Sequence, residues 1–195
     1  MRILAIGDVV GNIGCRFLRK RLPALKKLKG VDLVIANGEN SADGNGVTPI
    51  SADFLFSSGV DVITTGNHSF RRREIYPYYD DAPYILRPAN FPEKTTPGNG
   101  TLIYDMGRVQ VCVINLMGCV FLENLKDPYE TIDEILKKNT AKITILDFHA
   151  EATAEKLAMG YYLDGRISAM FGTHTHVQTA DECIFENGMG YITDV

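Results

Sequence analysis

The sequence predicts an α/β fold in which short buried strands alternate with helices. Short β-branched apolar runs recur along the chain, and each ends in a polar turn containing Gly, Asn, Asp or His. Helical patterns with capping residues follow several of these runs. Apolar runs on either side of Asp105-Met106-Gly107-Arg108 and of Glu186-Asn187-Gly188 predict hairpins, which add antiparallel pairs to the sheet.

The N-terminal part of the chain predicts strands and helices in strict alternation. Gly30 is placed to cap the first helix, and Thr48-Pro49 supplies an N-cap residue followed by a first-turn proline for the second. Pro23 lies within the first helical pattern, so we expect a kink or break near Leu22. The expected ranges are strands 2–6, 31–36 and 60–63, and helices 12–29 and 49–58.

The rest of the chain predicts a hairpin, further strand–helix alternation and a second hairpin. Asp127-Pro128 is typical of a helix start. The pattern stops at Val195 within a strand, so we expect a single domain over residues 1–195 that lacks its C-terminal end. The expected ranges are strands 102–104, 109–116, 142–146, 167–171, 182–185 and 190–195, and helices 127–139 and 151–159.

Composition excludes several classes of protein. Of the 195 residues, 45% are hydrophobic and 23% charged, which excludes a disordered or fibrous chain. No apolar stretch is long enough to span a membrane or to form the core of a signal peptide. The four cysteines form no C-x-x-C pair, which favours reduced, mostly buried thiols in a cytoplasmic protein. A net charge of −4 disfavours sequence-independent binding to long nucleic acids.

The histidines and several carboxylates all lie in polar turns that follow predicted strands. All four histidines follow apolar runs, in polar turns near glycine. The carboxyl ends of strands in an α/β sheet meet at one edge, where ligands bind. A single histidine is more often a hydrogen-bonded structural residue, but four at strand ends beside carboxylates and amides predict a metal site. The candidates are Asp8, Glu39, Asn40, Asn67, His68, His149, His174 and His176.

The same segments resemble the five sequence blocks of the calcineurin-like metallophosphoesterases. Their wording is similar to a narrower branch, the bacterial YmdB-like 2′,3′-cyclic-nucleotide 2′-phosphodiesterases, and the resemblance covers residues 1–195. It implies a mixed-sheet α/β sandwich with two β-sheets flanked by helices. Val10 stands where the wider superfamily has histidine, and Glu39 where it has aspartate; both features agree with the narrower branch. The blocks are G-D-V-V-G, N-G-E-N, T-G-N-H, D-F-H-A-E-A-T and G-T-H-T-H-V-Q-T.

The resemblance also implies the chemistry. It implies two metal ions, with iron and manganese favoured and zinc open, that generate a hydroxide to attack phosphorus. Glu39 is expected to bridge the ions. In this interpretation Asp8 and His176 complete one ion, Asn67, His149 and His174 complete the other, and Asn40 adds a ligand or orients the phosphate.

His68 is expected to act as the general acid for the departing 2′-oxygen, yielding a nucleoside 3′-phosphate. The alternative is that His68 only hydrogen-bonds a metal ligand. Asp147 and Glu151 have a similar ambiguity, because each could orient a neighbouring histidine or be purely structural.

Other functions stay open at this point. The expected substrate is a small cyclic nucleotide, and RNA and a homo-oligomer stay open as partners; no membrane is expected. A phosphomonoesterase or protein phosphatase would use the same ligands, and a regulatory module could bind metals without catalysis. A Rossmann-type nucleotide binder is disfavoured, because Gly7, Gly11 and Gly14 do not have the G-x-G-x-x-G spacing.

Overall fold

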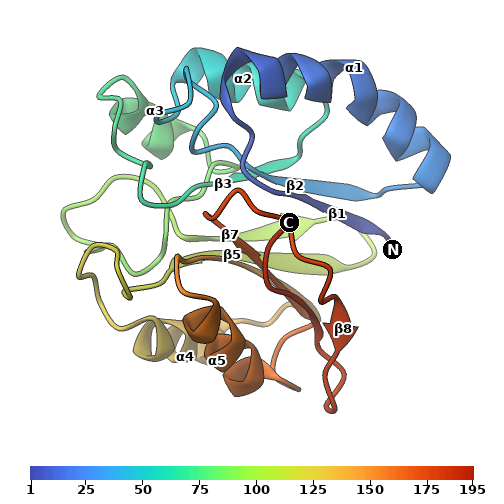
Figure 1. Cartoon of the computed structure of the whole chain (residues 1–195), viewed down its shortest axis with the longest axis vertical. Coiled ribbons are helices and arrows are strands. Elements are labelled where there is room, and N and C mark those ends of the chain that lie inside the picture. Colours follow the sequence, from blue (N-terminus) through green and yellow to red (C-terminus); the bar gives the residue numbers. More distant parts are fainter.

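The computed structural model describes residues 1–195 as two facing β-sheets with helices on the outer side of each (Figure 1). The first sheet is parallel and has the order β1-β2-β3, and the second is mixed and has the order β4-β5-β6-β7-β9-β8. Helices α1, α2 and α3 lie over the first sheet, and α4 and α5 over the second. The predicted fold class is confirmed.

The first layer follows the expected alternation. The N-cap Thr48 forms a capping box with Ser51, and Gly30 ends the first helix in a left-handed conformation, as predicted. The sequence predicts a kink or a break near Leu22; the first helix continues through Pro23, so the predicted break is wrong. Its apolar stripe packs into the core, and this burial outweighs the one backbone hydrogen bond that proline removes. The elements are β1 Ile3–Ile6, α1 Gly11–Lys29, β2 Leu33–Asn37, α2 Pro49–Ser57, β3 Val62–Thr64 and α3 Ile75–Asp81, of which α3 was not predicted.

The second layer contains both predicted hairpins. Strand β6 is longer than expected and includes His149, so this histidine lies at the end of a strand and not in a turn. The reason is that β6 pairs with strands on both sides as far as His149. The elements are β4 Thr101–Asp105, β5 Gln110–Met117, α4 Pro128–Lys138, β6 Ile143–His149, α5 Thr153–Leu163, β7 Ala169–Thr173, β8 Cys183–Ile184 and β9 Gly190–Ile192.

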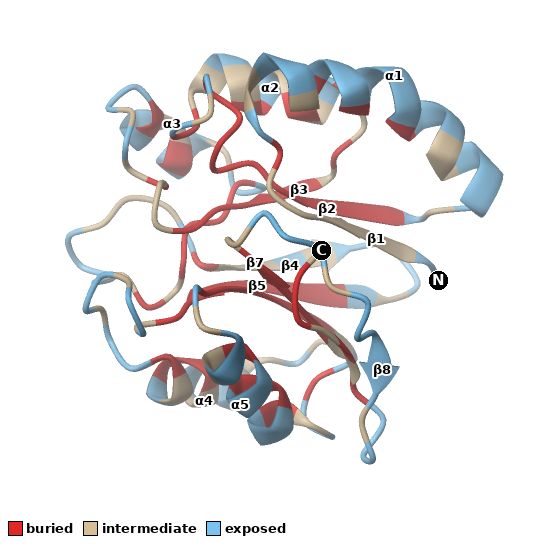
Figure 2. Cartoon of the chain, viewed as in Figure 1, coloured by how far each residue is buried: buried red, intermediate tan, exposed pale blue.

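Apolar side chains fill three spaces in this arrangement. One cluster lies between α1, α2 and the first sheet, and another between α4, α5 and the second sheet. The third lies between the sheets and combines residues such as Ile35 of β2 with Val113 of β5. Figure 2 shows the buried strands at the centre of the molecule. The two sheets are therefore held face to face, which fixes their strand ends relative to each other.

The cysteines differ in exposure. Cys15 and Cys112 are buried, whereas Cys119 is half-buried and Cys183 is exposed; all four are free thiols. The expectation of mostly buried thiols is therefore wrong for Cys183, because the short edge strand β8 has no helix over it. No helix has the length and apolar character needed to cross a membrane.

Candidate metal centre

Four buried polar side chains join the two sheets where their strands end. Asn37 ends β2, Thr64 ends β3 and Thr173 ends β7, while Asp147 lies in β6. The Asn37 Nδ2 lies 3.5 Å from Asp147 Oδ2 and 3.3 Å from Thr173 Oγ1. The Thr64 hydroxyl also donates to Asp147. These contacts fix the carboxyl ends of both sheets against each other and form the floor of the candidate site.

The side chains of this floor fix the orientation of His149 through its Nδ1. Its Nδ1 lies 2.9 Å from Thr173 Oγ1, and the Thr173 hydroxyl donates to Asp147 Oδ1 at 2.8 Å. Asp147 thus orients His149 through Thr173 and not by direct contact. Burial raises the pKa of the Asp147 carboxyl to about 7. With Nδ1 engaged in this way, Nε2 is the ring nitrogen that faces the site, and it offers a lone pair when the imidazole is neutral.

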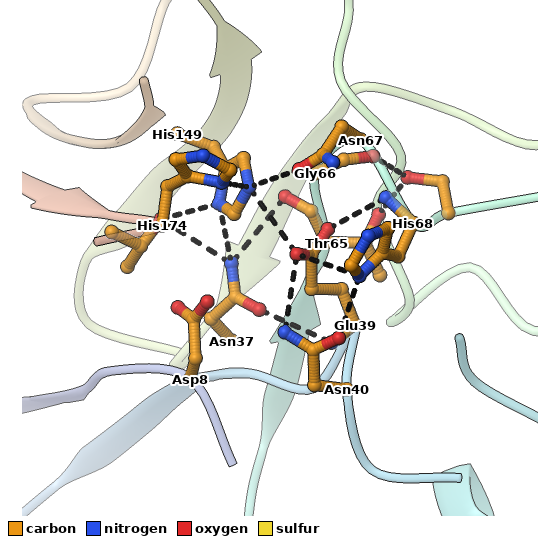
Figure 3. Close-up of polar contacts among 12 residues, drawn as sticks. Asp8, Asn37, Glu39, Asn40, Thr65, Gly66, Asn67, His68, His149 and His174 are labelled. Carbon is orange, nitrogen blue, oxygen red and sulfur yellow. Dashed lines mark hydrogen bonds and ion pairs between the residues drawn. The ribbon is translucent and has the colours of Figure 1, made fainter. Parts of the chain in front are cut away.

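Several electron-pair donors converge on His149 (Figure 3). Its Nε2 lies 2.9 Å from Asn67 Oδ1, 3.0 Å from His174 Nδ1 and 3.3 Å from Glu39 Oε1. Ligand atoms of Glu39, His149 and His174 lie within 4.8 Å of one another. His174 is oriented by Glu151, whose Oε2 is 2.8 Å from its Nε2. Two imidazoles, a carboxylate and an amide oxygen arranged in this way fit a transition-metal ion.

Asp8 and His176 extend the cluster on its other side. The His176 Nε2 lies 3.2 Å from Asp8 Oδ2 and 3.3 Å from the Asn40 amide nitrogen. Both carboxylate oxygens of Asp8 are buried, yet neither has a hydrogen-bond partner of normal geometry. Burial, with the nearby Glu39 carboxylate adding to it, raises the pKa of Asp8. A buried carboxylate without donors is costly, and a cation at this position would supply what it lacks.

Glu39 lies between the two groups. Its Oε2 accepts a hydrogen bond from the His68 backbone amide at 2.9 Å, and its Oε1 accepts one from Asn40 Nδ2 at 3.3 Å. Burial alone would raise its pKa, but the charge and hydrogen bond of His149, together with the His68 amide, lower it to about 2. Glu39 is therefore ionised and central, as a bridging ligand requires.

His68 contacts the cluster through one ring nitrogen. Its Nδ1 donates to Asn40 Oδ1 at 2.7 Å, while no hydrogen bond is formed by Nε2. The ring is partly exposed, unlike that of the fully buried His149. Contacts of 3.3 Å or less thus connect all eight predicted site residues, and the structure separates none of them from the others.

A buried ion pair supports the turn that carries His174 and His176. Both histidines have positive φ angles, 105° and 58°, which are uncommon for residues other than glycine. Between them, the Thr175 hydroxyl donates to Asp194 Oδ2 at 2.7 Å. Asp194 in turn pairs with Lys156, which is fully buried in α5. The buried ion pair therefore holds Thr175, and with it the turn that carries both histidines, in position.

Sequence reasoning missed five residues that support the site. Lys156 had a detectable signal, because it occupies the buried stripe of α5 with Met159, Gly160 and Leu163, where a charge is unexpected. Asn37 and Thr173 lie inside the recognised blocks but were not given a role. Thr64 and Asp194 carry no local signal, because their partners are distant in the sequence.

Comparison with known proteins agrees with the resemblance in the sequence. The family described as "YmdB-like protein" matches residues 4–195, nearly the whole chain. The chain belongs to the YmdB-like family. The YmdB-like chain is 50% identical to the 2′,3′-cyclic-nucleotide 2′-phosphodiesterase of Bacillus subtilis (strain 168), over 100% of its own length and 74% of that protein. The predicted family is therefore confirmed, as is the prediction of an enzyme of the phosphodiesterase type.

Solved structures give the same result. A hypothetical protein from Thermus thermophilus superposes on the YmdB-like chain with a TM-score of 0.95 and 40% identity, covering 100% of the chain and 76% of that protein. A phosphatase from Mycoplasma pneumoniae superposes with a TM-score of 0.93 and 33% identity, covering 99% and 70%. Both likenesses extend over the layers that carry the candidate metal centre.

Proposed function

We propose that this protein is a metal-dependent phosphodiesterase that hydrolyses 2′,3′-cyclic nucleotides to nucleoside 3′-phosphates. The Bacillus subtilis relative carries the name of this activity. The observation that carries the proposal is the convergence of electron-pair donors: the Asp8 oxygens, which have no hydrogen-bond partner of normal geometry, on one side of Glu39, and the facing ring nitrogens of His149 and His174 on the other. Such a donor set suits a pair of cations better than any hydrogen-bonded structural role.

The proposed ligands form two groups that share Glu39. Asp8 and His176 would hold one ion, with Asn40 adding an oxygen or orienting the phosphate. Asn67, His149 and His174 would hold the second. Mixed imidazole and carboxylate ligands favour manganese, iron or zinc over calcium and magnesium. When bound, these ions supply an activated water and stabilise negative charge on the phosphate oxygens.

His68 is the proposed general acid. Asn40 accepts the Nδ1 proton and so fixes the orientation of the ring, while Nε2 is free to hold the proton that the leaving 2′-oxygen requires. The contact with Asn40 also fits the alternative in which His68 only positions a ligand. The two roles differ in one respect: a general acid matters only when the leaving group needs a proton.

The test compares substrates in a His68→Ala variant. We expect turnover of 2′,3′-cyclic AMP to fall by about 10²–10⁴-fold, and that of bis(p-nitrophenyl) phosphate, whose leaving group needs no proton, to fall far less. Elemental analysis should still find about two equivalents of metal, as two-metal hydrolases hold. Loss of metal, or equal losses on both substrates, would contradict the general-acid role. The control, His176→Ala, should lose metal and both activities.

A phosphomonoesterase is the second candidate, because the structurally similar Mycoplasma pneumoniae protein is described as a phosphatase. The same metal-loaded preparation should be assayed with 2′,3′-cyclic AMP and with 3′-AMP. Faster hydrolysis of the cyclic diester supports the proposed function. Faster release of inorganic phosphate from 3′-AMP would favour the phosphomonoesterase, and no turnover of either would favour a non-catalytic metal-binding module.

A further inference from the structure

A cavity of about 480 Å³ lies on the outer side of the second sheet. It is bounded by α4, by the edge strand β4 and by the segment 87–101. Its apolar wall includes Ala89, Phe91, Ile103, Cys112 and Ile135. No residue of the candidate metal centre lines it, so it is a separate feature of the fold. Its size is within the range of small-molecule sites, which is roughly 300–1,000 Å³.

Arg87 lines this cavity with a charge that has no counter-ion. Its side chain is buried, with 3% of the residue exposed. It donates to two backbone carbonyls, from Nη1 to Pro88 at 2.9 Å and from Nε to Pro97 at 3.4 Å. No carboxylate lies within the 4.0 Å that defines an ion pair. Burial lowers the pKa of the guanidinium, although arginine stays charged in proteins. An uncompensated buried charge is costly, and an anion in the cavity would offset that cost.

The other charged groups lining the cavity leave it positive. Lys126 is neutralised by Glu134, whose carboxylate lies 2.6 Å away. Lys138 on α4 has no ion-pair partner. The exposed Glu93 is close enough to raise the pKa of Arg87 but does not pair with it. Three basic groups thus face two acidic ones, and the most buried member is the basic one.

We propose that this cavity binds a small organic phosphate, with the phosphate on Arg87 and the apolar body against Phe91, Ile103 and Ile135. The planar guanidinium fork matches phosphate geometry, and Lys138 adds a second positive charge at the rim. Inorganic phosphate alone would fill a small part of the volume, so the apolar wall calls for a ligand with a carbon body. The proposal is independent of the hydrolytic function assigned to the metal centre.

The test uses phenylphosphonate, which carries both features and cannot be hydrolysed as a phosphate ester. It should be titrated into the ¹⁵N-labelled protein of 195 residues with metal bound. We expect saturable shifts at the amides of Asn99 and Thr101, which line the cavity. Benzyl alcohol, which has the ring but no anionic group, should produce none. Shifts confined to Asn67 and His68 would place the probe at the metal centre and overturn the proposal.

Variants on α4 supply a matched pair. Lys138→Glu should weaken binding at the cavity by about fivefold. Lys137→Glu makes the same charge change at the neighbouring exposed position, which does not line the cavity, and should leave the affinity unchanged. Equal weakening by both would show non-specific attraction and overturn the proposal.

Arg87→Lys tests the guanidinium itself. It keeps the positive charge but loses the fork, and should weaken binding by about tenfold. Wild-type affinity in this variant would show that Arg87 does not hold the anion, and that its role is only to hold the loop through Pro88 and Pro97. If Arg87→Lys fails to fold, the lysine pair still decides the question.

Discussion

The two sheets contribute different chemistry to the candidate centre. Among the proposed metal ligands, the oxygen donors lie in turns that follow strands of the first sheet, whereas the imidazoles lie at or after strands of the second sheet. Neither half holds a complete ligand set, and the two meet because buried contacts such as Asn37 to Thr173 fix the sheet ends together. The centre is therefore a property of the sheet interface. The oxygen donors are Asp8, Glu39, Asn40 and Asn67, and the imidazoles are His149, His174 and His176.

The two halves are also supported differently. A carboxylate supports each segment that carries an imidazole ligand. Asp147 contacts His149 through Thr173, Glu151 contacts His174 directly, and Asp194 accepts a hydrogen bond from Thr175, which lies between His174 and His176. Asp8, in contrast, has no hydrogen-bond partner of normal geometry, although His176 Nε2 lies 3.2 Å from its Oδ2. The imidazole half is thus positioned by the protein's own side chains, whereas the Asp8 carboxylate lacks partners that a bound cation would replace.

The largest expected effect comes from the ion pair beneath the imidazole turn. Lys156→Met leaves Asp194 buried and uncompensated, which should lower the free energy of unfolding by about 3–5 kcal/mol. Urea denaturation in the presence of chelator measures this loss without any contribution from metal. The control Lys126→Met, which breaks an exposed pair, should change stability little. The double variant Lys156→Met/Asp194→Leu should recover part of the loss; equal values for Lys156→Met and the control would show that the pair does not support the turn.

Metal removal tests the oxygen half. Free metal at about 100 times its dissociation constant should stabilise the protein by about 2.7 kcal/mol, and chelation should remove this gain. Asp8→Asn should have opposite effects in the two states. Without metal it should be neutral or stabilising, because it removes a carboxylate whose charged form is disfavoured by burial and, to a lesser extent, by the Glu39 carboxylate. With metal present, Asp8→Asn should lose most of the stabilisation that metal binding gives the wild type. Strong destabilisation of Asp8→Asn in chelator would contradict the statement that the Asp8 carboxylate lacks hydrogen-bond partners.

Substitution of a residue in the floor of the site should change the affinity for metal more than the free energy of unfolding. Thr173→Val breaks the link between His149 and Asp147 and keeps the side-chain shape. Loss of such an orienting contact should weaken metal binding by about 10–100-fold, measured by electron paramagnetic resonance titration with Mn²⁺. Thr173→Ser keeps the hydroxyl and should bind nearly as well as the wild type. If the valine variant also binds normally, the Asp147 contact does not orient His149.

The sequence was sufficient to predict the alternation of strands and helices and the clustering of the eight site residues, and the reason is physical. Buried strands are recognisable as apolar runs, and parallel strands place whatever follows them at a common edge. Asp8, Glu39 and Asn67 follow such runs directly, so their convergence could be inferred. The supporting contacts could not, because Asn37 meets Asp147 across 110 residues and Lys156 meets Asp194 across 38.

Two errors have the same origin in tertiary structure. The local pattern around Pro23 predicts a kink or a break, but no break occurs, because packing of the buried stripe of α1 keeps the helix continuous. The apolar run that ends at Leu146 predicts a short strand, yet pairing with β5 and β7 extends β6 through polar Asp147 to His149. In both cases contacts from distant segments outweigh the local preference.

The smallest expected effect on metal affinity comes from Glu151, the exposed carboxylate that contacts His174. It allows a comparison with Thr173, which is buried and contacts His149. Glu151 contacts His174 as directly as any carboxylate in the site, but its side chain is 49% exposed. Water can replace an exposed partner, and solvent weakens its electrostatic contribution, so Glu151→Gln should weaken Mn²⁺ binding by only about two- to fivefold. The same titration used for Thr173→Val provides the comparison. A loss in Glu151→Gln as large as that in Thr173→Val would mean that a direct contact matters more than burial, and that His174 depends on its carboxylate as strongly as His149 depends on its own.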